Sequence, residues 1–190
     1  DITLELQEGD VLPETYHFSR GESRNSILAK AKTAMKNELA AAFAGKDKDL
    51  PLTTEKELLT LASIIEKETG LASERGKVAS VFVNRLNLGM KLQTDPTVIY
   101  AVTNGQMNLG RPLYKKDLTA DSPYNTYVYA GLPPAPICSP GREAIRAAAH
   151  PEKTKYLYFV ADGLSGGHRF ARSLTEHNKN VVLYRKQRGR

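Results

Sequence analysis

The chain has 190 residues, of which 41% are hydrophobic and 25% are charged, and it carries a single cysteine, Cys138. This is the size and composition of one globular domain with a core of its own. It excludes a wholly disordered chain, a collagen-like chain and a small disulfide-stapled protein.

The formal net charge is +6, and it is unevenly distributed: residues 1–95 sum to −2 and residues 96–190 sum to +8. A basic half is compatible with an acidic polymer, nucleic acid or an anionic membrane surface as partner. Solvated helix faces and a basic tail at residues 185–190 explain the same charge without any partner, and this simpler interpretation is favoured.

In chain order, the first expected elements are an extended entry broken at Pro13 and a strand over Thr15–Phe18. Apolar spacings of three and four predict a helix over residues 22–44. A second helix is expected to begin after Thr54, because Glu57 completes a capping-box pattern, and to end near Gly70.

A third helix is predicted with Ser73 as its cap and Gly89 at its end. Asp95 is expected to cap a short helix that has Pro96 in its first turn. Residues 103–139 contain five prolines and are expected to be irregular, and so long a loop is more often functional than merely connecting.

The C-terminal third predicts a helix over residues 139–147, strands over 156–161 and 168–171, and a last helix capped by Ser173 with Glu176. The expected fold class is α+β, with several helices packed around a small antiparallel sheet.

Motifs for metals and phosphates are missing from the sequence. It has no histidine pair at i,i+4, no C-x-x-C, no calcium loop, no G-x-S-x-G elbow and no glycine-rich phosphate loop. We therefore expect no metal site and no cofactor. Cys138 is expected to be a buried thiol without a chemical role.

The segment from Leu61 to Gly70 contains two glutamates beside an apolar helix face. At 100° per residue, Glu66 and Glu68 lie at opposite edges of this face, about 160° apart. Only one of them can therefore face a given cleft, where partial desolvation would raise its pKa and suit a general acid. Periodicity leaves the choice open, and two ordinary surface charges explain the pattern as well.

A second group of polar and aromatic residues consists of Gln93, Thr94, Asp95, Tyr100 and the run Tyr124–Tyr127. Rings that stack on sugar faces and polar groups that fix orientation are typical of a sugar or peptide groove. A tyrosine-rich strand edge, with Asp95 acting only as a cap, is the equally weighted alternative.

Taken together and in order, these stretches resemble the catalytic domain of the endolytic murein transglycosylases of the MltG (YceG-like) family. The resemblance runs over almost the whole chain. Its motifs are Leu12–Tyr16, Leu61–Thr69, Ala72–Arg75, Val78–Leu86, Gly89–Tyr100, Tyr124–Tyr127, Gly131–Pro134, Ala147–Pro151, Tyr156–Gly163, Gly167–His168 and His177–Asn178.

The resemblance implies that Glu66, the first glutamate of Glu-Lys-Glu-Thr, is catalytic. It implies endolytic cleavage between N-acetylmuramic acid and N-acetylglucosamine that leaves 1,6-anhydro ends. A single carboxyl suffices, because the sugar's own C6 hydroxyl is the nucleophile and the group acts first as acid and then as base. The candidate groove residues are Asn84, Arg85, Gln93, Asp95, Tyr100, Tyr124, Asn125, Thr126, Tyr127 and His168.

The resemblance also implies one catalytic domain over residues 1–190, with residues 1–8 as a remnant of a LysM-like subdomain. We expect peptidoglycan glycan strands as substrate, cell-wall synthases such as penicillin-binding proteins as partners, and no nucleic acid. The expected location is the periplasmic side of the bacterial inner membrane, with a single-pass anchor upstream of Asp1 in the full-length protein.

Three other functions remain in view. A lysozyme-like hydrolase would need a second carboxylate near Glu66, for which Asp95 is the best candidate. A glycan-binding scaffold would need no catalytic group. A nucleic-acid-binding module is suggested only by the charge and lacks any recognised motif.

Overall fold

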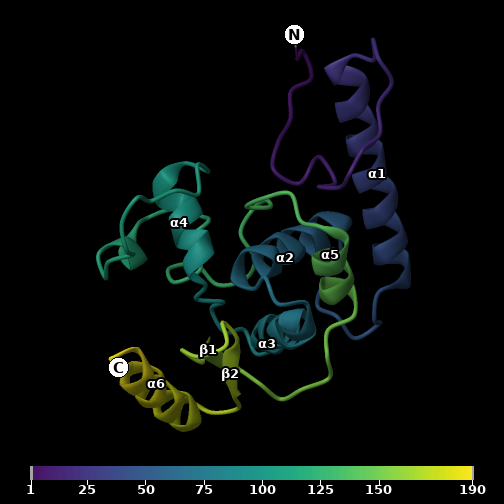
Figure 1. The fold of residues 1–190 in the computed structure, drawn as a ribbon. Coiled ribbons are helices and arrows are strands. Elements are labelled where there is room, and N and C mark those ends of the chain that lie inside the picture. The colour runs from purple at the N-terminus through teal and green to yellow at the C-terminus, as the bar shows by residue number, and fades with distance from the viewer. Residues whose placement is uncertain (1, 190) are drawn as a thin grey trace.

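The computed structural model describes residues 2–189 and confirms the α+β class (Figure 1). Within these residues lie six α-helices and one two-stranded antiparallel sheet. The elements are α1 (Arg24–Gly45), α2 (Glu55–Glu68), α3 (Arg75–Asn87), α4 (Asp95–Thr103), α5 (Arg142–Ala149), β1 (Tyr158–Ala161), β2 (His168–Ala171) and α6 (Leu174–Arg188).

Helix α2 forms the centre of the molecule, where it packs against α1, α3, α4 and α5 (Figure 1). Its apolar face is fully buried; the side chains at 0% exposure are Leu58, Leu61, Ala62, Ile64 and Ile65. The predicted capping box is confirmed, with Thr54 accepting from the Glu57 N–H and the Glu57 side chain accepting from the Thr54 N–H. Burial of this apolar face, worth about 1.5–3 kcal/mol per large side chain, makes α2 the scaffold for the glutamates at its end.

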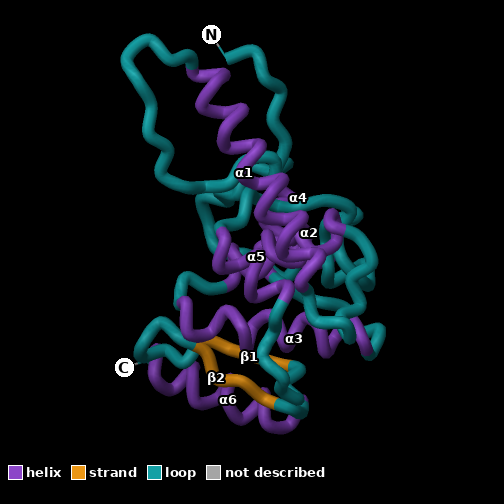
Figure 2. Tube along the Cα trace, turned by 90° about the vertical axis from the view of Figure 1, so that its right-hand side faces the viewer, coloured by secondary structure: helices purple, strands orange, loops and turns teal. Residues whose placement is uncertain are grey.

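The sheet is a hairpin in which Tyr158 pairs with Ala171 and Ala161 pairs with His168. Figure 2 shows it at one end of the molecule, between α3 and α6. Phe159 packs its ring edge-on to Phe82 of α3, with centroids 5.9 Å apart. The hairpin therefore joins the core through one aromatic contact region rather than occupying the centre.

The predicted strand over Thr15–Phe18 is wrong. These residues belong to an irregular segment, and the Phe18 side chain is 68% exposed. Among the described residues no second strand pairs with this segment, so its β-propensity finds no ladder to complete. Tyr16 instead donates its hydroxyl to the Leu12 carbonyl at 2.8 Å.

Four predicted helix starts shift by one to three residues: α1 begins at Arg24 instead of residue 22, and α5 begins at Arg142 instead of residue 139. Ser73 lies in a 3₁₀ turn (Ala72–Glu74), and α3 begins at Arg75 without a side-chain cap. The N-cap of α4 is Thr94 rather than Asp95, and its hydroxyl makes no capping bond, because it donates to Glu68. The shifts of α3 and α4 lie beside the site described below.

Residues 185–188, expected to be part of a tail, form the last turn of α6. Basic side chains there lie at the negative end of the helix dipole. Residues 2–8 are irregular, while residues 1 and 190 lie outside the described part of the chain. In residues 2–189 no helix is long and apolar enough to cross a bilayer.

Candidate functional site

The two glutamates of α2 meet different parts of the fold. The Glu66 carboxylate accepts the backbone N–H of Gly141, the N-cap residue of α5, at 3.2 Å. A carboxylate there satisfies an otherwise free donor and complements the positive end of the helix dipole. Glu66 thus links α2 to the N-terminus of α5 by a hydrogen bond.

Glu68 instead faces an open cavity of about 170 Å³, here called the Glu68 cavity. Its lining residues come from α2, α3, β1 and the segments around α4; they are Glu68, Arg85, Leu92, Gln93, Asp95, Tyr127 and Phe159. Four of the predicted groove residues are therefore brought together around Glu68, and Glu66 is not among the lining residues.

The environment of Glu68 favours its protonated form. Burial, reinforced by the nearby negative charge of Asp95, raises its pKa to about 7, although the Thr94 hydroxyl bond and the charge of His168 act in the opposite direction. A carboxyl with this pKa exists in both protonation states near neutral pH. That is the condition under which one group can donate a proton and later take one back.

Arg85 forms one wall of the cavity but is itself a structural residue. The side chain is only 7% exposed. Its guanidinium donates to the carbonyls of Leu157 (2.7 Å), Leu92 (2.8 Å) and Lys91 (3.1 Å). These bonds fasten α3 both to the segment entering β1 and to the segment preceding α4, so Arg85 sets the shape of the cavity.

Asp95 and Tyr127 form a hydrogen-bonded pair at the mouth of the cavity. The Tyr127 hydroxyl donates to Asp95 Oδ1 at 2.7 Å, and both residues line the cavity. Burial, followed by the bond to Asp95, raises the pKa of Tyr127, so its phenol stays protonated. Asp95 thus remains an acceptor that is already occupied on one oxygen.

Gln93 has a left-handed backbone, with φ of +50°. Such a conformation costs a residue other than glycine about 1 kcal/mol or more and persists where the surroundings impose it. Its N–H donates to the Thr126 carbonyl at 3.2 Å, which holds the turn. The exposed side chain is therefore presented at the cavity instead of lying along a regular element.

His168 lies behind the cavity and is held by Glu74. One Glu74 oxygen accepts the His168 backbone N–H at 2.9 Å, and the other contacts its Nδ1 at 2.8 Å. The imidazole packs edge-on against Phe159, whose ring lines the cavity. Gly167 makes this approach possible, because a Cβ there would lie 2.7 Å from the Glu74 oxygen.

Two predicted groove residues are buried structural groups. Asn125 is 0% exposed, and its amide donates to the carbonyls of Leu118 (3.1 Å) and Ala120 (2.8 Å). Thr126 is 2% exposed, and its hydroxyl accepts the Thr94 N–H at 3.1 Å. They hold the long loop against α4, so the loop presents Tyr127 but not its neighbours.

Tyr100 and Tyr124 lie together elsewhere. Their rings pack with centroids 4.7 Å apart and line a separate depression with Glu8 and Pro136. The predicted ring pair exists, but it is not part of the Glu68 cavity.

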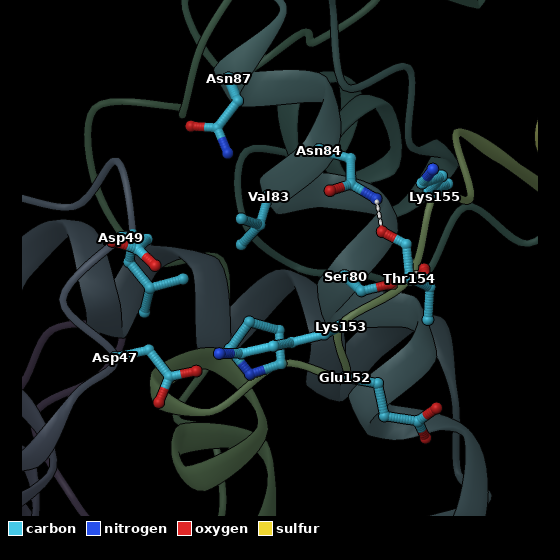
Figure 3. Close-up of a pocket in the computed structure, with 12 residues that line it drawn as sticks. Asp47, Asp49, Ser80, Val83, Asn84, Asn87, Glu152, Lys153, Thr154 and Lys155 are labelled. Atoms are coloured by element: carbon cyan, nitrogen blue, oxygen red, sulfur yellow. Dashed lines mark hydrogen bonds between the residues drawn. The ribbon is translucent and has the colours of Figure 1, made fainter.

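Asn84 lies on a different face of α3 from Arg85. Its amide donates to the carbonyls of Thr154 (3.1 Å) and Tyr156 (2.9 Å), and it lines a cavity of about 380 Å³, here called the Asn84 cavity (Figure 3). This cavity is larger than the Glu68 cavity, whereas the carboxyl with the raised pKa belongs to the smaller one.

Residues 2–189 contain no group of three or more metal-ligating side chains. Cys138 is buried, as expected, and burial raises the pKa of its thiol to about 12. Among the described residues, Glu68 is the glutamate that both lines a cavity and has a pKa raised to about 7. The sequence alone placed Glu68 at one of two equivalent helix edges and offered no signal that favoured it over Glu66.

Fold and site together define a class: an α+β domain in which a polar surface cavity holds two carboxyls, one of them with a raised pKa. The chain belongs to the YceG-like family, whose family model matches residues 2–182. It is 44% identical over 177 residues to a protein of Bacillus subtilis (strain 168) named endolytic murein transglycosylase, an alignment covering 93% of this chain and 48% of that protein.

A protein with the same name from Streptococcus pneumoniae (strain D39) is 36% identical over 179 residues, covering 92% of this chain and 32% of that protein. The crystal structure of a YceG-like protein from Listeria monocytogenes superposes with a TM-score of 0.73 at 39% identity, covering 90% of this chain and 54% of that one. The chain thus spans about half the length of the first relative and less of the second.

Proposed function

We propose that this chain is the catalytic domain of an endolytic murein transglycosylase, with Glu68 as its acid–base residue. The names of its relatives support the murein transglycosylase activity, and membership of the YceG-like family supports applying that activity to this chain. The observation that carries the assignment of Glu68 is the placement of its carboxyl in the cavity, with a pKa raised to about 7.

In the proposed reaction, protonated Glu68 gives its proton to the glycosidic oxygen between N-acetylmuramic acid and N-acetylglucosamine. The bond from that oxygen to the muramic C1 breaks. The C6 hydroxyl of the same muramic residue closes on C1 and gives its proton to the Glu68 carboxylate. The products are a 1,6-anhydro end and a free hydroxyl on the leaving sugar, and no water is consumed.

Glu68 replaces Glu66 in this proposal for a geometric reason. A general acid must reach the oxygen that it protonates. Glu66 is engaged with the N-terminus of α5 and lies outside the lining of the cavity, whereas Glu68 opens onto it. The two side chains point to opposite edges of α2, so the same substrate atom cannot meet both.

The remaining lining residues have supporting roles in the proposal. Thr94 holds one Glu68 oxygen and leaves the other for the substrate. Gln93 and the Asp95–Tyr127 pair offer amide, carboxylate and phenol groups for sugar hydroxyls and acetamido groups. The nearby Phe159 ring gives the cavity an apolar wall.

A hydrolase is the second candidate, and one observation favours it: Asp95 lies in the same cavity as Glu68. A hydrolase would use Asp95 as nucleophile or base and release a reducing end. The Tyr127 bond to Asp95 argues against this role, because it occupies one oxygen of the carboxylate.

The test is digestion of purified murein, followed by mass spectrometry of the fragments. A transglycosylase yields anhydro ends, which are lighter than the reducing ends of a hydrolase by one water. Glu68→Gln keeps size and hydrogen bonding but loses the exchangeable proton, so cleavage should fall by about 10²–10⁴-fold.

Glu66→Gln is the matched control, since it changes the neighbouring glutamate of the same helix in the same way, and it should retain most of the activity. The opposite ranking of the two variants would return the acid–base role to Glu66. Wild-type cleavage should also decline as pH rises above about 7, since the proton donor is then depleted.

The proposal extends to location and partners. Murein lies outside the inner membrane, so the domain is proposed to work on the cell-wall side of that membrane, held there by a single-pass anchor in the full-length protein. Cell-wall synthases are the proposed partners. Fractionation of cells with an antibody to this domain tests the location, and recovery with the cytosol would contradict it.

A further inference from the structure

The Asn84 cavity, of about 380 Å³, is within the size range of ligand pockets and has no role in the proposed reaction. Figure 3 shows its walls, which come from the α1–α2 connection, α3 and the α5–β1 connection. The lining residues are Asp47, Asp49, Leu50, Ser80, Val83, Asn84, Asn87, Pro151, Glu152, Lys153, Thr154 and Lys155.

Both loop walls of this cavity are held in place by hydrogen bonds. On one side, Asp47 donates its N–H to the Ala149 carbonyl at 3.0 Å, and its carboxylate contacts His150 Nδ1 at 2.8 Å. On the other side, the Thr154 hydroxyl bonds with Ser80 at 2.6 Å, and its carbonyl accepts from Asn84. The cavity is therefore pre-formed, which lowers the cost of ordering it around a ligand.

Opposite charges face each other across the opening. Figure 3 shows Asp47 and Asp49 on one side and Lys153 extending toward them from the other, while the Glu152 carboxylate points away. Yet within residues 2–189 no ion pair joins Asp49, Lys153 or Lys155 to any partner. The two signs are held apart by open space rather than neutralising each other.

Between the charges lie groups that suit a peptide. Leu50, Val83 and Pro151 provide an apolar floor. The Asn84 amide nitrogen is bonded to backbone carbonyls, whereas its oxygen points away from that bond, and the Asn87 amide also lines the cavity (Figure 3). Free amide groups match peptide N–H and C=O groups.

We propose that the Asn84 cavity binds the stem peptide of murein, a short peptide that carries a free ammonium group and carboxylates. This inference rests on the proposed function. The ammonium group would lie at Asp47 and Asp49, a carboxylate at Lys153 and Lys155, and the intervening methyl groups on the apolar floor. A neutral sugar would leave these charges without partners.

The proposal places one murein strand in both cavities. Arg85 and Asn84 are adjacent on α3, project about 100° apart and line different cavities. A five-residue stem peptide spans about 17 Å when extended. The proposal therefore requires the peptide on a glycan in the Glu68 cavity to extend past the Thr154–Leu157 segment, which accepts hydrogen bonds from both Asn84 and Arg85, into the Asn84 cavity.

The direct test titrates the protein with a synthetic stem pentapeptide that carries no sugar, while backbone NMR shifts are followed. We expect saturable shifts around Asp49, Asn84 and Lys153. The same peptide with acetylated amines and amidated carboxylates should bind at least about tenfold more weakly. The variants Lys153→Met and Asp49→Asn should bind the unmodified peptide more weakly by the same factor. Lys179→Met, an exposed charge change on α6, should bind as wild type does.

A second measurement separates this proposal from the proposed function. On intact murein, Lys153→Met should raise KM while kcat is retained; on strands whose peptides have been removed by an amidase, it should match wild type. Glu68→Gln should lose cleavage but bind the free peptide normally. Absence of saturable peptide binding, or an equal effect of Lys153→Met on both substrates, would overturn the peptide site whatever the outcome for Glu68.

Discussion

The two cavities on either side of α3 differ in what lines them. The Glu68 cavity is the smaller, at about 170 Å³ against about 380 Å³, and its polar groups are mostly bonded to one another or to backbone. The Asn84 cavity is lined by Asp49, Lys153 and Lys155, exposed charges that lack ion-pair partners within residues 2–189, and by Asp47, which contacts His150.

The difference shows that volume and chemical reactivity are separate properties of a surface. A carboxylate in open solvent keeps an ordinary pKa, whereas Glu68 has been partly removed from water and titrates near 7. The larger cavity offers charge and space for recognition. The smaller one offers a group whose proton is exchangeable at neutral pH.

The largest expected effect comes from comparing two single variants at neighbouring residues of α3, Arg85 and Asn84. Arg85→Met leaves three backbone carbonyls without their charged donor, so we expect the free energy of unfolding to fall by about 3–5 kcal/mol. Asn84→Ala removes two neutral bonds and should cost about 1–3 kcal/mol. Urea unfolding measures both, and equal losses would contradict the distinction between the two walls.

The second test measures how much the buried, ionised Glu68 carboxylate lowers the free energy of unfolding. Its pKa is about 7 in the folded protein and 4.5 ordinarily, so the folded state retains a proton that the unfolded chain releases between these pH values. Wild-type stability therefore falls as pH rises from about 4.5 to 7. Glu68→Gln does not titrate, and it should be the more stable protein by up to about 3 kcal/mol at pH 8, with no advantage at pH 4.

Denaturant unfolding at the two pH values measures this difference, with Glu66→Gln as the control. A stability gap for Glu68→Gln that does not change with pH would show that Glu68 is not desolvated in the folded protein.

The third test concerns the loop that carries Asn125, which is buried, and Tyr127, which lines the Glu68 cavity. Asn125→Ala leaves the Leu118 and Ala120 carbonyls unpaired and should lower stability by about 1–3 kcal/mol. Tyr127→Phe removes only the bond to Asp95 and should affect cleavage more than stability. Circular dichroism melting and a murein digestion assay on both variants check this, and the reverse pattern would place Asn125 in the groove.

The smallest expected effect is that of Gln93→Gly. Glycine adopts the positive φ without strain but gains entropy when unfolded, so the net change in stability should stay within about 1 kcal/mol. Activity should nevertheless fall, since the amide at the cavity is lost. A variant with full activity would remove Gln93 from substrate binding.

Local pattern was sufficient for most of the secondary structure. The capping box at Thr54, the apolar stripe of α2 and the β1–β2 hairpin all depend on interactions within a few residues, and all three were predictable. The strand expected at Thr15–Phe18 was not, because a strand requires a partner that sequence patterning does not supply.

The sequence by itself determined that Glu66 and Glu68 lie at opposite edges of a buried helix face, since helical periodicity alone dictates that arrangement. Only the tertiary structure decided the surroundings of each. The N-terminus of α5 packs over one edge and occupies Glu66, while Thr94, Asp95 and Tyr127 converge on the other and leave Glu68 at an opening. The pKa of a carboxyl depends on the burial and charges around it, and these come from segments distant in the chain.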